Sequence, residues 1–187
     1  MPGGPLLVSV KWFIAAGLFK THKVTRVELL SHDFRGKNIV IIGNPATGKT
    51  TLARLIADGL GMYEQWKIVH TDAYMKPGRK DDYRLALYEM IADLQKIHVP
   101  VIVEGVQGYR LLRKGVEGHE GWHFYPDIVI ELTASDEQVR RVYETQRKGK
   151  DVGSLTGFNK MHQTILEEYR AMDNPSPPVW YTVENKF

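Results

Sequence analysis

One stretch of the sequence combines glycines, a lysine and hydroxyl side chains at the spacing of a phosphate-binding loop. It fits the pattern G-x-x-x-x-G-K-[ST] and consists of Gly43, Asn44, Pro45, Ala46, Thr47, Gly48, Lys49 and Thr50. The glycines allow successive backbone N–H groups to turn toward a phosphate, and the following helix adds the positive end of its dipole. We expect Lys49 to contact the β- and γ-phosphates of ATP and the Thr50 hydroxyl to bind Mg²⁺. Thr51 completes the predicted nucleotide-binding residues.

The residues around this motif supply the context that it requires. Residues 39–42 (Ile-Val-Ile-Ile) form an apolar run typical of a buried strand. A helix is expected from Lys49 to Ile56. A Gly-rich turn that carries a lysine by chance would not need this strand in front of it, so the sequence favours a phosphate loop.

Two acidic residues follow predicted strands on the same edge of the sheet. Asp72 comes after a strand expected at 67–70, and Glu104 ends a strand expected at 99–103. Ligands of open α/β sheets bind beyond the carboxyl ends of the strands, so both carboxylates are expected near the phosphate loop. Phosphoryl transfer to an alcohol needs one carboxylate to accept the proton and an acidic group to help hold Mg²⁺. We assign Asp72 as the base and Glu104 as the metal ligand or acceptor-orienting group. The reverse assignment, and plain roles as a turn acid or helix cap, stay open.

A basic segment follows the strand expected at 128–132. Its charged residues are Arg140, Arg141, Arg147, Lys148 and Lys150. Guanidinium groups on a closing lid neutralise charge on a transferred phosphoryl group and exclude water. We therefore predict a lid at about 140–157 with Arg141 and Arg147 as catalytic candidates. The alternative is a solvated helix face.

The phosphate loop needs a sheet and helices to position it, and the pattern of the chain provides them. Strands are expected at 24–30, 39–42, 67–70, 99–103, 128–132 and 179–183, and helices at 49–56, 81–98, 135–147 and 158–172. The first of these strands is interpreted as an antiparallel edge strand. Alternation of strands and helices predicts an α/β fold of three layers, with a mostly parallel central sheet flanked by helices.

Length and composition fit one domain. The chain has 187 residues, of which 43% are hydrophobic and 25% charged, which is ordinary for a globular protein. We expect a single domain over 1–187, with residues 1–37 as an N-terminal extension with edge elements. The absence of cysteine suits a reducing cytoplasm, and the apolar stretch 6–19 is too short to span a membrane. The net charge is +3, and the first 50 residues hold seven basic and two acidic residues, which permits a polyanionic partner.

Taken together, these motifs resemble the nucleoside and nucleotide kinase branch of phosphate-loop proteins, over roughly residues 38–150. The segments 104–115, 157–160 and 178–180 are similar to those of phage 5-hydroxymethyluracil DNA kinases. This resemblance implies Mg²⁺ and ATP as cofactors, a hydroxymethyl group on a base in modified phage DNA as the acceptor, and the host cytoplasm as the location. The candidate acceptor-binding residues are Tyr74, Lys76, Arg79, Gln107, Arg110 and Trp122.

Two segments bear on the acceptor. The basic loop 75–80 (Met-Lys-Pro-Gly-Arg-Lys) suits a phosphate backbone. The segment 115–126 holds Trp122, Phe124 and Tyr125, which fit either stacking on an extruded base or packing on the core. Its two histidines, His119 and His123, form either a metal pair or two solvated side chains.

Other classes of function fit less well. A GTPase would show an Asn-Lys-x-Asp motif, and the two Asn-Lys pairs at 159–160 and 185–186 lack the aspartate. A motor ATPase would need a helical lid domain for which 187 residues leave no room. A free nucleoside or nucleotide kinase, another small-molecule kinase, and a nucleotide-binding ATPase module stay open. The sequence predicts no oligomeric state.

Overall fold

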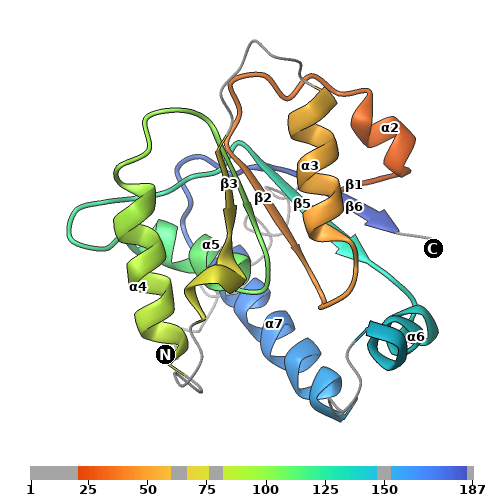
Figure 1. The fold of residues 1–187 in the computed structure, drawn as a ribbon. Helices are drawn as coiled ribbons and strands as arrows, with labels where there is room; N and C mark the ends of the chain where they lie inside the picture. Colours follow the sequence, from red (N-terminus) through yellow and green to blue (C-terminus); the bar gives the residue numbers. More distant parts are fainter. Residues whose placement is uncertain (1–20, 60–66, 76–81, 147–152, 185–187) are drawn as a thin grey trace, which may run out of the picture.

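The computed structural model describes residues 21–59, 67–75, 82–146 and 153–184. A six-stranded, all-parallel sheet forms its centre, in the order β1-β6-β5-β2-β4-β3 (Figure 1). The strands are β1 (Thr21–Val24), β2 (Ile39–Gly43), β3 (Lys67–His70), β4 (Val101–Glu104), β5 (Ile128–Thr133) and β6 (Val179–Glu184). The helices are α2 (Arg26–Leu30), α3 (Lys49–Gly59), the 3₁₀ turn η1 (Thr71–Tyr74), α4 (Tyr83–Leu94), α5 (Gly108–Glu117), α6 (Asp136–Gln146) and α7 (Gly153–Ala171). The predicted α/β fold is confirmed.

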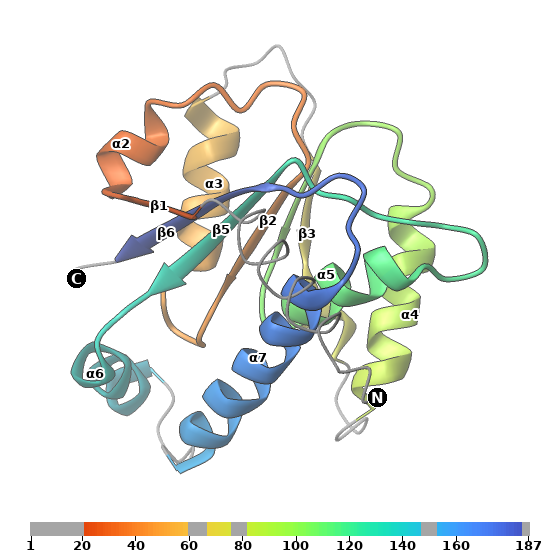
Figure 2. The same ribbon diagram turned by 180° about the vertical axis from the view of Figure 1, so that it is seen from behind.

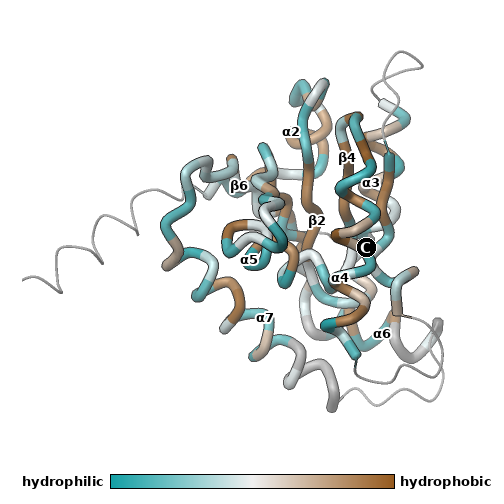
Figure 3. The backbone as a smooth tube through the Cα atoms, turned by 90° about the vertical axis from the view of Figure 1, so that its left-hand side faces the viewer, coloured by the Kyte–Doolittle hydropathy of each residue, from teal (hydrophilic) through white to brown (hydrophobic). Residues whose placement is uncertain are grey.

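Helices cover both faces of the sheet, which explains why its central strands are apolar throughout. α2 and α3 lie on one face, and α4, α5 and α7 lie on the other (Figures 1 and 2). Within β2, Ile39 and Ile41 pack on the α3 side, whereas Val40 and Ile42 pack on the α5 and α7 side. The hydropathy colouring of the backbone follows this arrangement, with the strand interior brown between polar outer turns (Figure 3). The result is a three-layer sandwich.

Strand register brings the chemically important residues to one edge. All strands are parallel, so their carboxyl ends share one edge of the sheet. Figure 1 shows β2 running down to this edge, where it leads into the phosphate loop and α3. Glu104 of β4 lies opposite both Ile41 of β2 and His70 of β3. Gly43 lies opposite Leu132 of β5. The carboxyl ends of four neighbouring strands therefore surround the phosphate loop.

The prediction of an antiparallel edge strand over 24–30 was wrong. The strand β1 ends at Val24 and runs parallel to β6, and Arg26–Leu30 is the helix α2. Thr25 and Glu28 form a capping box, because the Glu28 N–H donates to Thr25 Oγ1 at 3.2 Å and the Thr25 N–H donates to Glu28 Oε2 at 2.7 Å. These reciprocal bonds satisfy two backbone donors at the start of the helix.

Candidate functional site

The phosphate loop has the backbone geometry that an anion-binding loop requires. Gly43 and Gly48 adopt positive φ angles of 147° and 87°, and Ala46 between them adopts 65°. A Cβ atom on Gly43 would overlap the Leu132 carbonyl oxygen of β5. Ala46 is a non-glycine residue in a region that costs energy for L-residues, and such strain is typical of functional loops. The loop, which also contains Pro45, leads to Thr50 and Thr51 in the first turn of α3.

Lys49 points back into the loop. Its ammonium donates to the carbonyl oxygens of Gly43 at 3.0 Å and Asn44 at 2.7 Å, and the residue is only 8% exposed. A buried ammonium requires acceptors on all sides. Phosphate oxygens held by the loop would be stronger partners than carbonyls because they are charged.

Glu104 is joined directly to the phosphate loop. The Thr50 hydroxyl donates to Glu104 Oε1 at 3.0 Å, and the same oxygen lies 2.6 Å from Nδ1 of His70. Glu104 is 5% exposed. A carboxylate and a hydroxyl are hard oxygen ligands, and Mg²⁺ in phosphoryl-transfer sites is held by one or two such groups together with substrate phosphates. The pair therefore fits Mg²⁺.

Asp72 lies beside Glu104 but in a different environment. It is exposed in the turn η1, at the end of β3. Gly105 allows this approach, because it adopts a φ of 125° and a Cβ atom there would overlap Thr71 Oγ1 and lie 3.4 Å from Asp72 Oδ1. No described residue donates a hydrogen bond to the Asp72 carboxylate. Its oxygens are accessible to an acceptor hydroxyl.

A polar network at the start of α5 continues from this edge. Arg110 donates to Gln107 Oε1 at 3.0 Å, lies 3.2 Å from the Met161 sulfur on α7, and packs over the Tyr83 ring at 4.4 Å. Burial lowers the pKa of the guanidinium from its ordinary value. The candidates Gln107 and Arg110 are thus brought together, and the Gln107 N–H donates to Thr71 Oγ1, next to Asp72 in the sequence, at 3.3 Å.

The candidate Tyr74 is directed elsewhere. Its hydroxyl donates to Asp93 on α4 at 3.1 Å. Burial, followed by this bond to Asp93, raises the pKa of Tyr74 to about 12. Tyr74 therefore connects η1 to α4 rather than facing the phosphate loop.

His162 on α7 is a site residue that sequence reasoning missed. It is 3% exposed and its ring stacks on Tyr109 of α5 at a centroid distance of 4.0 Å. Burial, helped by the charges of Arg110 and Lys49, lowers the pKa of His162 to about 4. The available signal was a polar residue three positions before Ile165 on the apolar face of the helix.

The neutral state of His162 predicts how stability depends on pH. Between pH 6.5 and about 4 the unfolded chain binds a proton at this position and the folded chain does not. The free energy of unfolding should therefore fall as the pH drops through this range. We expect His162→Phe, which keeps a ring against Tyr109, to show a shallower fall in urea unfolding between pH 7 and 5. An equally steep fall in the variant would contradict this assignment.

The helix α6 is anchored on the phosphate loop. Val139 is 4% exposed and packs with Ala46 and Ala134. Ser135 and Gln138 form a capping box at its start, since the Ser135 N–H donates to Gln138 Oε1 at 3.0 Å and the Gln138 N–H donates to Ser135 Oγ at 3.3 Å. Arg141 is exposed on this helix. The other lid candidate, Arg147, and the acceptor candidates Lys76 and Arg79 lie outside the described residues.

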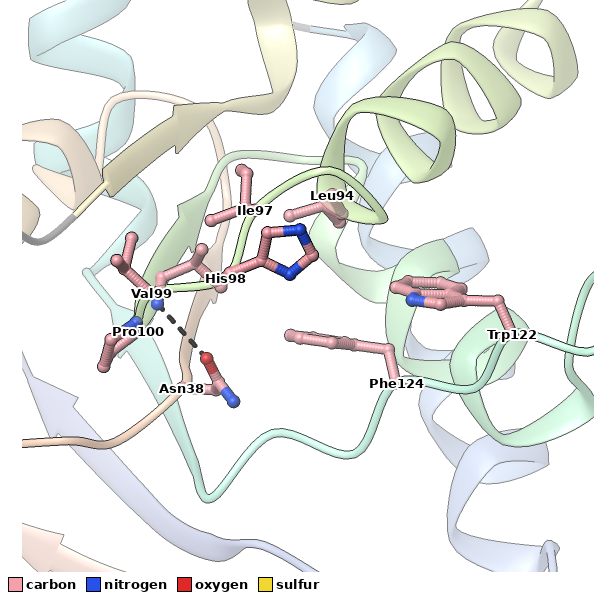
Figure 4. A pocket seen from close by; sticks show the side chains of 9 residues that line it. Asn38, Leu94, Ile97, His98, Val99, Pro100, Trp122 and Phe124 are labelled. Atoms are coloured by element: carbon pink, nitrogen blue, oxygen red, sulfur yellow. Dashed lines mark hydrogen bonds between the residues drawn. The ribbon is translucent and has the colours of Figure 1, made fainter.

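Trp122 does not lie at the phosphate loop. It lines a pocket of about 330 Å³ together with Phe124, Asn38 and Val101. Asn38 directly precedes β2 and Val101 is the first residue of β4, so the pocket lies at the amino ends of these strands. Figure 4 shows Trp122 and Phe124 on one side of this pocket, and their rings are stacked at 5.7 Å. The structure therefore separates this tryptophan from the site where phosphoryl transfer would occur, and packing on the core is the better interpretation.

The two histidines of the same segment are also explained by packing. His119 stacks on Tyr88 at 4.4 Å and His123 on Tyr125 at 5.8 Å. In the part of the chain that the structure describes, no group of three or more His, Cys, Asp or Glu side chains is arranged to hold a metal ion. No described helix is long and apolar enough to cross a membrane.

Comparisons with known proteins give structural similarities only. No protein-family model matches the chain, and no curated protein matches it. Shikimate kinase from Bacteroides thetaiotaomicron is 16% identical, with a TM-score of 0.48 and coverage of 80% of this chain and 86% of the kinase. A possible uridine kinase from Bacillus stearothermophilus is 12% identical, with a TM-score of 0.43 and coverage of 83% and 94%. An uncharacterized protein from Eubacterium ventriosum is 11% identical, with a TM-score of 0.38 and coverage of 79% and 89%. Because these scores lie below 0.5, the fold assignment depends on the strand order and the phosphate loop.

Proposed function

We propose that the chain is an ATP-dependent kinase that transfers the γ-phosphoryl group to an alcohol. The hydrogen bond between Thr50 and Glu104 carries this proposal, because it joins the phosphate loop to a buried carboxylate at the end of a neighbouring strand. Asp72 lies next to Gly105, the residue that follows Glu104, and is exposed. A loop for phosphates, an oxygen pair for Mg²⁺ and a separate carboxylate are the parts that phosphoryl transfer requires.

We assign each site residue a role in phosphoryl transfer from its surroundings. The Lys49 ammonium contacts the β- and γ-phosphates and neutralises charge that develops on them. Thr50 and Glu104 hold Mg²⁺, which supplies further charge neutralisation when bound. Asp72 orients the acceptor hydroxyl and accepts its proton. Arg141 and Arg147 are our candidates for the groups that would neutralise charge on the transferred phosphoryl group.

A groove along the same edge supports nucleotide binding. It has a volume of about 810 Å³, and its lining includes Ala134 and Ser135 of the β5–α6 connection, Thr182 and Glu184 of β6, Lys23 of β1, and Arg26 and Glu28 of α2. Ala134 also packs with Ala46 of the phosphate loop. The groove is large enough for the nucleoside part of ATP.

The leading acceptor in our proposal is the hydroxymethyl group of 5-hydroxymethyluracil in phage DNA, and a free nucleoside or another small alcohol is the alternative. The resemblance of residues 104–115, 157–160 and 178–180 favours the DNA acceptor. Transfer of radiolabelled γ-phosphate to free nucleosides, nucleotides, 5′-hydroxyl DNA and hydroxymethyluracil-containing DNA tests it. ATP hydrolysis that no acceptor stimulates would instead indicate an ATPase.

A DNA acceptor predicts a strong dependence on salt. Contacts between basic side chains and backbone phosphates release counterions, so activity on DNA should fall steeply between about 50 and 200 mM salt. Replacing Lys76, Arg79 and Lys80 with alanine should flatten this slope and raise the KM for DNA without changing the KM for ATP. Robust transfer to free nucleosides with none to hydroxymethylated DNA at low salt would leave the small-molecule kinase.

A further inference from the structure

A small cavity lies beside the phosphate loop, on the α7 side of the sheet. It has a volume of about 180 Å³ and is lined by residues from the start of the loop, the carboxyl end of β5, α5 and α7. Its polar side chains are Asn44, Tyr109, Glu131, Thr133, Asn159, His162 and Gln163. Pockets for drug-sized ligands measure about 300–1,000 Å³. This cavity therefore has room for a single ring and not for a whole nucleotide.

The cavity adjoins the groups that would act on the γ-phosphate. The Asn44 carbonyl accepts a hydrogen bond of 2.7 Å from the Lys49 ammonium. The charge of Lys49 also contributes to the lowered pKa of His162, which lines the cavity. The cavity therefore borders the phosphate loop at the residue whose carbonyl holds the Lys49 ammonium.

The charge of the lining disfavours an anionic ligand. None of the described lining residues is a lysine or arginine, and Glu131 is a carboxylate that accepts a hydrogen bond of 3.2 Å from the Trp180 indole. His162 is neutral near pH 7. A phosphate group carries about −1.5 to −2 charges and is recognised by lysine and arginine. The cavity lacks those partners among its described residues.

The side chain of Asn159 favours a neutral hydrogen-bond donor over an anion as the ligand of this cavity. Its side-chain oxygen is buried and has no hydrogen-bond partner in the described part of the chain. A buried acceptor without a donor is costly, and such groups in native structures are normally satisfied by a water or a ligand. A ring N–H would supply the donor. Amide side chains recognise base edges in this way, and enzymes that act on an extruded base read its edge by hydrogen bonds.

We infer that this cavity receives an uncharged, hydrogen-bonding ring of the acceptor, so that the product is a phosphate monoester and not a diphosphate. The inference rests on the proposed kinase function. In the step, the acceptor hydroxyl oxygen forms a bond to the γ-phosphorus while the bond from that phosphorus to the ADP oxygen breaks. The hydroxyl proton passes to Asp72, and ADP leaves with the electrons of the broken bond.

Binding measurements with two matched nucleosides test the charge preference without requiring turnover. We use calorimetric titration of the full chain, in the presence of Mg²⁺ and ADP, with 5-hydroxymethyl-2′-deoxyuridine and 5-carboxy-2′-deoxyuridine. The neutral ring should bind at least about tenfold more tightly, because the carboxylate would face Glu131. The same two bases in a short single-stranded oligonucleotide distinguish a free nucleoside from DNA as the source of the ring. Two results would overturn the inference. One is that the 5-carboxy base binds as tightly as the 5-hydroxymethyl base, or more tightly, both as a nucleoside and in the oligonucleotide. The other is that the 5-hydroxymethyl base binds neither as a nucleoside nor in the oligonucleotide.

The variant Asn159→Leu tests the cavity itself. It should weaken binding of the neutral ring about tenfold, as expected for one lost hydrogen bond, and leave ADP affinity unchanged. Its Tm should stay the same or rise, because an unsatisfied buried oxygen is removed, whereas a merely structural asparagine would give a lower Tm. Glu167→Leu, at an exposed position of the same helix outside the lining, is the matched control and should bind like wild type.

The outcomes separate the inference from the proposed function. Weaker ADP binding in Asn159→Leu with unchanged nucleoside binding would assign the cavity to the nucleotide and overturn the inference. Selective binding of the neutral ring without phosphoryl transfer to any acceptor would contradict the kinase and leave the cavity as a ring-binding site.

Discussion

Lys49→Met is expected to reduce phosphoryl transfer by about three orders of magnitude, since charged groups aimed at a transferring phosphoryl group contribute on this scale. The structure makes methionine the better replacement than alanine. Lys49 is only 8% exposed, so its aliphatic stem packs in the loop and truncation would open a gap. Steady-state rates with labelled ATP measure the effect.

A control on the same helix separates loss of chemistry from loss of folding. Arg54→Met removes a positive charge from the exposed side of α3 and should retain the wild-type rate. Both variants should keep the far-UV circular dichroism of the wild type. A Lys49→Met enzyme that turns over at close to the wild-type rate would rule out the phosphate loop as the catalytic centre.

The phosphate loop was predictable because its determinants are local. The run 39–42 is apolar at every position, and the strand β2 is indeed buried on both faces. The motif then follows without a gap. In the N-terminal region the local signals conflicted: residues 24–30 alternate polar and apolar side chains like a strand, while Thr25 and Glu28 have the spacing of a capping box. The capping box prevailed, because it satisfies backbone donors that water would otherwise have to bind.

The roles of the acidic residues needed information that the sequence lacks. From the chain alone, we assigned Asp72 as the base and Glu104 as the metal ligand or acceptor-orienting group, but the reverse stayed open because both follow strands at the same edge. The register that sets Glu104 opposite Ile41 and His70 also brings it to the Thr50 hydroxyl. Burial then favours the metal role for Glu104 and the proton-accepting role for the exposed Asp72.

Side chains far apart in the sequence were the least predictable. Trp122 was chosen because its type suits stacking on a base, but its loop joins α5 to β5 at the amino edge of the sheet. Conversely, Asn159 and His162 lie more than a hundred residues after the phosphate loop and contact its surroundings only because α7 packs on α5. Glu131 offered one local hint, as a charged residue within an otherwise apolar strand.

Replacing the base should remove the proton acceptor and leave nucleotide binding intact. We expect Asp72→Asn to lower kcat by about 10²–10⁴, the usual contribution of general base catalysis, with the KM for ATP nearly unchanged. Asp58→Asn, an exposed carboxylate on α3, is the control and should have no effect.

Glu104→Gln provides the complementary test, because the two carboxylates differ in what they contact. Loss of the charge beside Thr50 should raise the Mg²⁺ concentration needed for half-maximal rate, and added Mg²⁺ should restore part of the activity. Added Mg²⁺ should not rescue Asp72→Asn. If instead Asp72→Asn responds to Mg²⁺ and Glu104→Gln does not, the two roles are exchanged: Glu104, despite its burial and its bond to the Thr50 hydroxyl, would be the base.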